Sequence, residues 1–184
     1  MIYPIFAYGQ NVLNKKGSNV EEMNAEIQTL ISDMFETMDA ANGVGLAAPQ
    51  IGKSIRLFVI DSKPMYPKEE NAKGLRSAFI NPEIIEETGE EFAFEEGCLS
   101  IPEIRESVFR LPTLKIRYWD ENFVEQNKVF NGMNARVIQH EYDHIEGVLF
   151  IDHLSAFKKR LIKSKLTNVK KGKTRASYPM KFVK

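Results

Sequence analysis

The residues that decide the fold are 134–147, which read NARVIQHEYDHIEG. They predict a helix over residues 134–146, and Gly147 ends it because glycine readily adopts the left-handed conformation that closes helices. Residues four apart share one helix face, so His140 and His144 can reach one metal ion, with Glu141 beside a water on that ion. In a chain with three histidines, this HExxH pattern arises by chance on the order of once in a few hundred sequences. The stretch therefore predicts a catalytic metal site.

Two histidines leave a catalytic metal site one protein ligand short. No glutamate follows Glu146, and the long zinc-protease pattern HExxHxxGxxH fails at its last position, which here is Phe150. Asp152 and His153 remain as downstream candidates, and we expect a surface position for each.

Upstream, Cys98 lies in the segment EGCLS, residues 96–100, where Gly97 permits a tight turn. A lone cysteine is ordinarily a small buried hydrophobic residue. Beside a two-histidine helix without a third ligand, we expect the Cys98 thiolate to complete the set and leave a fourth position open to water. One sulfur and two imidazole ligands suit Fe(II), Zn(II), Co(II) or Ni(II).

Outside this helix, the hydrophobic pattern predicts further elements. An amphipathic helix is expected over residues 20–41, and its apolar face holds Ile27, Leu30, Ile31, Met34, Phe35 and Met38. Strands are expected over residues 55–61, 78–85, 92–94, 113–119 and 123–130, and a last helix from about residue 154. Residues 43–52 and 62–77 are expected to be loops. The fold class is therefore α+β, with mixed or antiparallel strands around a central HExxH helix.

The composition fits one globular domain, since 43% of the 184 residues are hydrophobic and 27% are charged. No apolar run reaches the roughly 18 residues that a membrane helix needs, so we expect no membrane partner. The N-terminal residues do not have the pattern of a signal peptide. A single cysteine cannot form an internal disulfide and suits the reducing cytoplasm.

The zero net charge hides a strong asymmetry along the chain. Residues 153–184 carry 11 of the 25 basic residues and none of the 25 acidic ones, so this segment is at +11 and the rest at −11. Such a segment suggests an anionic partner such as nucleic acid, and a solvated tail is the equal alternative. We expect a catalytic domain over residues 1–166 and a mobile basic tail over residues 167–184.

Three segments together resemble one family, the peptide deformylases. They are GVGLAAPQ at 43–50, EGCLS at 96–100 and QHEYDH at 139–144. Their order and spacing match the family over about residues 2–165, and the first two segments are rare outside it. The basic C-terminal helix resembles the bacterial type 1 branch.

The resemblance implies an enzyme that removes the formyl group from the formyl-methionine of nascent polypeptides and releases formate. It implies Fe(II) as the native ion and Zn(II) as a less active one. A cytoplasmic monomer is expected, and ribosomal RNA is the natural anionic surface for the basic tail. Turnover of a short formyl peptide should not need residues beyond 166.

Roles for individual residues also follow from the resemblance. Glu141 would act as general base on the water and then as general acid. The Gln50 side-chain amide and the Leu99 backbone N–H would stabilise the oxyanion of the tetrahedral intermediate. Gly45 would let the substrate backbone come close.

A pocket for the methionine side chain is implied as well. Its matching positions are Val44, Phe94, Glu96, Met133, Arg136 and Val137. Arg136 departs from an aliphatic lining, although its stem could pack while its charge faces water. Arg105 matches a residue of the family's cleft, with a surface salt bridge as its alternative.

Two other functions remain open on the residues alone. A metallopeptidase would also use HExxH, but that class usually completes its site with His, Glu or Asp, and a casein digestion assay would reveal it. A structural metal domain would need four protein ligands and would leave Glu141 without a role.

Overall fold

The computed structural model describes residues 1–183, so Lys184, the last residue of the expected tail, lies outside the described residues. A five-stranded antiparallel sheet has the order β2 (Gly45–Ala47), β3 (Leu57–Asp61), β4 (Arg76–Thr88), β7 (Thr113–Trp119) and β8 (Glu125–Asn131). Two smaller sheets pair β5 (Phe92–Cys98) with β6 (Ile101–Arg110) antiparallel, and β1 (Ile5–Phe6) with β9 (Met180–Lys181) parallel. The α+β prediction is confirmed.

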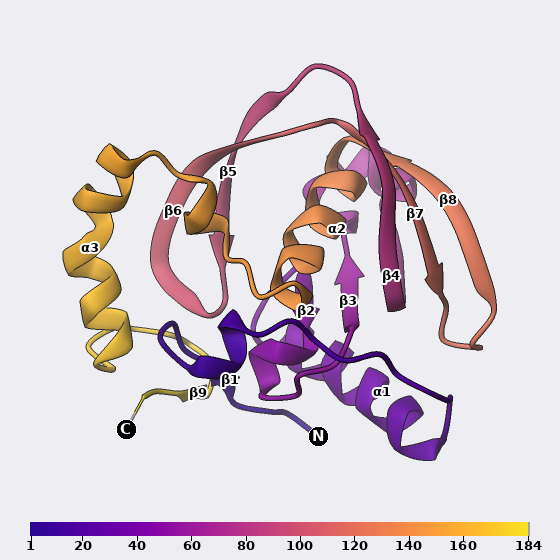
Figure 1. The fold of residues 1–184 in the computed structure, drawn as a ribbon, viewed down its shortest axis with the longest axis horizontal. Coiled ribbons are helices and arrows are strands. Elements are labelled where there is room, and N and C mark those ends of the chain that lie inside the picture. The colour runs from indigo at the N-terminus through magenta and orange to yellow at the C-terminus, as the bar shows by residue number, and fades with distance from the viewer. Residues whose placement is uncertain (184) are drawn as a thin grey trace.

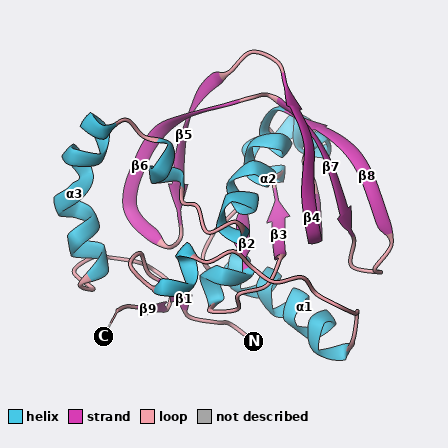
Figure 2. Cartoon of the chain, viewed as in Figure 1, coloured by secondary structure: helices cyan, strands magenta, loops and turns pink. Residues whose placement is uncertain are grey.

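The three α-helices are α1 (Ala25–Ala40), α2 (Gly132–Ile145) and α3 (Ala156–Lys170), and Figure 2 shows their positions around the strands. Short 3-10 helices are η1 (Asn11–Asn14), η2 (Ala48–Ile51), η3 (Lys63–Met65), η4 (Lys68–Lys73) and η5 (Phe150–His153). Within residues 1–183, none of the helices is long and apolar enough to cross a membrane.

Helix α2 lies at the centre of the molecule, between the five-stranded sheet and the β5–β6 hairpin (Figure 1). Its apolar side chains, such as Ala135 and Ile138, pack with Phe58 and Phe79 of the sheet. Burying an aromatic side chain of this kind contributes about 1.5–3 kcal/mol. Because the apolar face of α2 packs on the sheet, its polar face, which carries both ligand histidines, faces the β5–β6 hairpin.

Helix α1 begins five residues later than the sequence pattern predicts. Asn24 is its N-cap, and the Asn24 side chain accepts a hydrogen bond from the Ile27 N–H at 3.0 Å. Such a cap contributes about 1 kcal/mol. Val20 is held apart from the helix, because its N–H donates to the side chain of Asn81 at 2.8 Å.

The strands also differ from the predicted ones in informative ways. Strand β6 was not predicted, and Pro102 stands near its start, a position that an edge strand tolerates. The short strand β2 was not predicted either, because it lies in the expected loop 43–52. Strand β8 begins at Glu125 and not at residue 123, because Phe123 takes a left-handed φ of 58° in the preceding turn.

Helix α3 packs on the outer side of the β5–β6 hairpin (Figure 1). Its buried side chains Ile162, Leu166 and Val169 join the same core cluster as Ile104 and Val108 of β6. The expected domain boundary at residue 166 lies inside this helix, and the mobility of the tail stays a prediction. Beyond α3 the chain returns to the N-terminal segment through the β1–β9 pair.

Candidate metal centre and active site

The turn between β5 and β6 places Cys98 against the polar face of α2. The ligand atoms of Cys98, His140 and His144 all lie within 4.8 Å of one another, and Cys98 Sγ is 3.2 Å from His144 Nε2. The other downstream candidates lie in different contacts: Asp152 accepts from the Leu149 N–H, and His153 contacts Asp143. The structure thus brings together the three expected ligands.

Glu96 orients one of these ligands. Its Oε2 lies 2.9 Å from His140 Nδ1, so the Nδ1–H of His140 donates to the carboxylate and leaves Nε2 as the nitrogen available to an ion. Carboxylates in this position fix the ring and its tautomer. Glu96, expected in the methionine pocket, is therefore also a partner of the metal ligand.

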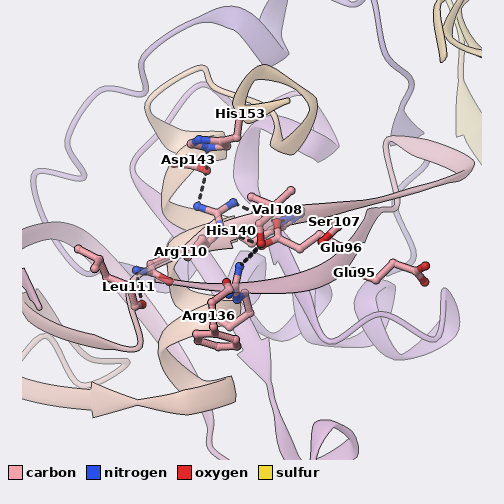
Figure 3. A network of polar contacts seen from close by, with 12 residues as sticks. Glu95, Glu96, Ser107, Val108, Arg110, Leu111, Arg136, His140, Asp143 and His153 are labelled. Carbon is pink, nitrogen blue, oxygen red and sulfur yellow. Dashed lines mark hydrogen bonds and ion pairs between the residues drawn. The ribbon is translucent and has the colours of Figure 1, made fainter. Parts of the chain in front are cut away.

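Two buried arginines neutralise Glu96 (Figure 3). Arg110 donates to both carboxylate oxygens, at 2.7 and 3.0 Å, and Arg136 donates to Oε1 at 3.0 Å. Burial alone would raise the pKa of Glu96, but hydrogen bonds from His140 and Arg110 hold that pKa well below its ordinary value. The carboxylate is thus fixed in its charged, accepting form.

Arg136 differs from what the sequence suggested. Only 2% of the residue is exposed, so its charge does not face water. Its guanidinium donates to the carbonyls of Val108 and Phe92 at 3.1 and 2.8 Å and stacks over the Phe92 ring at 4.4 Å. The buried carboxylate of Glu96 explains why an arginine can occupy this interior position.

The Glu141 side chain lies against strand β2, next to Gly45. It is 3% exposed, and its Oε2 has no hydrogen-bond partner among the described residues. Burial raises the pKa of Glu141 to about 7, although the nearby His140 and His144 act in the opposite direction. A carboxyl group with such a pKa can accept and return a proton near neutral pH. A Cβ at Gly45 would lie 2.3 Å from Glu141 Oε1, so only glycine leaves room for this carboxylate.

A hydrogen bond from the nearby backbone orients the side chain of Gln50. Its Oε1 accepts from the Ala47 N–H at 2.8 Å, which turns the amide nitrogen toward Cys98 Sγ at 3.4 Å and Ser100 Oγ at 3.3 Å. The side chain is 1% exposed and lies on η2. A buried amide donor beside the ligand cluster can serve an oxyanion without reorganisation.

The cluster opens onto a cleft of about 420 Å³. Of the expected pocket residues, those lining it are Val44, Gly45, Phe94, Glu96, Arg105, Arg136 and Val137. Leu99 also lines the cleft, whereas Met133, on the first turn of α2, is not among its lining residues. Arg105 lines the cleft as expected, and it also forms the surface salt bridge that was its alternative, to Glu95 at 2.8 Å.

The donor set fits a divalent ion. Burial would raise the pKa of the Cys98 thiol, but the charges of His144 and His140 outweigh it and lower that pKa to about 5, so a thiolate is favoured. One thiolate and two imidazoles, with His140 oriented by a carboxylate, match the three-ligand sets of catalytic metal sites. Within residues 1–183, this is the one group of three or more His, Cys, Asp and Glu side chains whose ligand atoms could hold a metal ion.

Sequence reasoning missed Arg110, which links Glu96 to Asp143 by a second ion pair at 2.8 Å. A signal was present, because Arg110 follows the inward-facing Val108 by two residues on β6. It also missed Met65 and Ile101 in the cleft lining, and neither carries a motif that would reveal it.

Comparisons with known proteins agree on one family. The family described as polypeptide deformylase matches residues 2–160. Peptide deformylases of Christiangramia forsetii and Cytophaga hutchinsonii are 54% and 55% identical to the chain; each match covers 99% of this chain, and 96% and 98% of the relative. The crystal structure of a peptide deformylase from Legionella pneumophila has a TM-score of 0.82 and 39% identity, and covers 95% of this chain and 99% of that one.

Proposed function

This chain belongs to the peptide deformylase family, and we propose that it performs the family's reaction with one divalent ion held by Cys98, His140 and His144. The enzyme removes the formyl group from the formylated N-termini of nascent polypeptides. The observation that carries the ligand assignment is that the three ligand atoms lie within 4.8 Å of one another, at a cleft that Cys98, His140 and Glu141 line.

Glu141 is the proposed proton carrier. An ion in this site would supply hydroxide from water near neutral pH. The unpartnered Oε2 of Glu141 is free to accept the proton of that water, and the pKa of about 7 allows it to pass the proton to the leaving amine. The same side chain thereby serves as base and then as acid.

The oxyanion of the tetrahedral intermediate needs hydrogen-bond donors. We assign this role to the amide nitrogen of Gln50, which is aimed at Cys98, and to the N–H of Leu99, the next residue in the chain. Both belong to buried or half-buried segments that are held before substrate arrives. Donors of this kind act most strongly where water is excluded.

The methionine side chain is assigned to the cleft between β2, β5 and α2. Val44, Phe94 and Val137 supply an apolar lining close to His140. The Arg136–Glu96 ion pair forms a charged but neutralised part of the same lining.

We further assign the chain to the bacterial type 1 branch, with Fe(II) as its native ion and Zn(II), Co(II) or Ni(II) as possible replacements. The basic helix α3 supports the branch, and the sulfur–imidazole ligand set supports these ions. The single cysteine, which favours a reducing compartment, supports a cytoplasmic location. We also propose that the enzyme is a monomer that acts on chains leaving the ribosome.

The ribosome is the proposed partner of the basic C-terminal region. Arg160, Lys163 and Lys165 are exposed on α3, outside the buried stripe formed by Ile162, Leu166 and Val169. Replacing all three by Gln should weaken co-sedimentation with ribosomes and reduce its dependence on salt, because phosphate contacts release counterions. Unchanged binding, or binding indifferent to salt, would leave the basic region as a solubilising one.

The direct test of the proposed function is anaerobic purification with metal analysis, followed by formate release from formyl-Met-Ala. One ion per chain and formate release are expected. Digestion of casein without formate release would favour the metallopeptidase instead.

A further inference from the structure

We propose that Tyr178 is a positioning residue for the active site, because its hydroxyl holds the turn that carries Cys98 and Leu99. The proposal rests on the proposed function in one respect, the role of the Leu99 N–H as an oxyanion donor. Tyr178 lies 80 residues beyond Cys98 in the basic C-terminal region, where the sequence motifs place no part of the catalytic machinery. The proposal therefore departs from the expectation that turnover of a short formyl peptide needs no residue beyond 166.

The return of the chain after α3 brings Tyr178 to this place. The Ile5 N–H donates to the Pro179 carbonyl and the Ala7 N–H donates to the Lys181 carbonyl, both at 2.9 Å. The Gln10 side chain donates to the Phe182 carbonyl at 2.8 Å. The residues that follow Tyr178 are therefore anchored to the N-terminal segment by two backbone hydrogen bonds and one from the Gln10 side chain.

The Tyr178 hydroxyl donates to the Leu99 carbonyl at 2.8 Å. The ring is half-buried and packs with Leu99 against the core cluster that α1 forms with the sheet. Burial, together with the nearby Cys98, raises the pKa of Tyr178 to about 12, so the hydroxyl keeps its proton at physiological pH. The Tyr178 hydroxyl is therefore a hydrogen-bond donor to the Leu99 carbonyl at physiological pH.

This contact constrains the direction of the neighbouring N–H. The Leu99 carbonyl and the Leu99 N–H belong to consecutive peptide planes, which are related only by the two backbone torsions of Leu99. The next carbonyl, that of Ser100, accepts from the Tyr8 N–H at 2.8 Å. Tyr178 from the C-terminal end and Tyr8 from the N-terminal end therefore donate hydrogen bonds to successive carbonyls of the turn. Cys98, in the same turn, faces α2.

A second contact of the same segment supports this role. Glu103 of β6 accepts from the Thr174 hydroxyl at 2.6 Å and from the Arg175 N–H at 3.0 Å. Glu103 lines the cleft and has a left-handed φ of 63°. The C-terminal segment, residues 171–183, thus contacts the hairpin both at its turn and at the start of β6.

Tyr178→Phe tests the proposal because it keeps the ring and removes only the hydroxyl. Tyr3→Phe is the matched control, since Tyr3 packs partly buried against the same core cluster and its pKa is raised by burial and by Asp33, away from the turn. Both variants and the wild type are compared for kcat and KM on formyl-Met-Ala, metal content, Tm, and amide hydrogen exchange of residues 97–101.

We expect Tyr178→Phe to lower kcat about three- to tenfold, which is the rate factor that corresponds to the free energy of one lost hydrogen bond. KM should stay within about twofold of the wild-type value. Exchange in residues 97–101 should rise, while metal content and Tm match those of Tyr3→Phe. Unchanged kcat and unchanged exchange would overturn the proposal, and so would a fall in Tm or metal content that accounts for the loss of activity. A wild type that releases no formate would instead refute the proposed function, while the exchange data would still report on the turn.

Discussion

Gly45→Ala should separate the position of Glu141 from its chemistry. The added Cβ would lie 2.3 Å from Glu141 Oε1 and 2.6 Å from Cδ. Ordinary contacts of a Cβ begin at 3.4 Å, so the carboxylate or strand β2 must move by about 1 Å. Glu141 is 3% exposed and has little room to yield.

A displacement of this size at a reacting group costs about 10²-fold in rate. We therefore expect kcat on formyl-Met-Ala to fall by about 10²-fold. The protein should keep one ion, because the three atoms nearest to the added Cβ all belong to Glu141, which is not a ligand. Formate release under steady-state conditions and metal analysis measure the two quantities on the same preparation.

The double variant with Glu141→Gln is the control. If Gly45→Ala acts through Glu141, its effect should largely disappear once the carboxylate is absent, since residues in one functional unit are not additive. Independent, multiplying effects would place Gly45 in substrate binding alone. Turnover of Gly45→Ala within twofold of wild type would refute the steric argument.

Three further substitutions test the rest of the site. Cys98→Ala should lose tightly bound metal and activity together, and retention of one ion with normal turnover would overturn the ligand assignment. Gln50→Ala should lower kcat by about 10²–10³-fold with a smaller effect on KM, as for the loss of one oxyanion donor; a change confined to KM would place Gln50 in ground-state binding. Glu96→Gln leaves the buried Arg136 without its counter-charge and leaves Arg110 with Asp143 alone, so urea unfolding should show a loss of about 3–5 kcal/mol. Metal titration of the same variant should show about 10–100-fold weaker binding. A loss below 1 kcal/mol would contradict the importance of this network.

The sequence predicted the local parts of the site well. His140, Glu141 and His144 lie within one helical turn and a half, so their relation depends only on helix geometry. Cys98 followed from the shortage of a third ligand near that helix. The α+β class followed from the order of the apolar patterns. Strand β6 was not predicted, because Pro102 argues against a strand unless the strand is known to lie at an edge.

The long-range parts could not be read in this way. Glu96 was expected in the pocket, and its bond to His140 depends on how the β5–β6 hairpin folds over α2. The buried position of Arg136 depends on the same packing, since its counter-charge comes from a strand 40 residues away. Tyr178 contacts Leu99 only because the chain returns after α3 to pair β9 with β1, and no local sequence pattern predicts this pairing.

Glu141→Gln, compared with wild type at equal metal content, tests the central claim most directly. Gln fills the same space and can hydrogen-bond a water but cannot take its proton. The wild type should release formate from formyl-Met-Ala, and the variant should keep one ion and its fold while losing about 10²–10⁴-fold in kcat. A wild type without formate release, or a loaded variant within about tenfold of wild type, would contradict the assignment of Glu141 as the proton carrier of a metal-dependent deformylase.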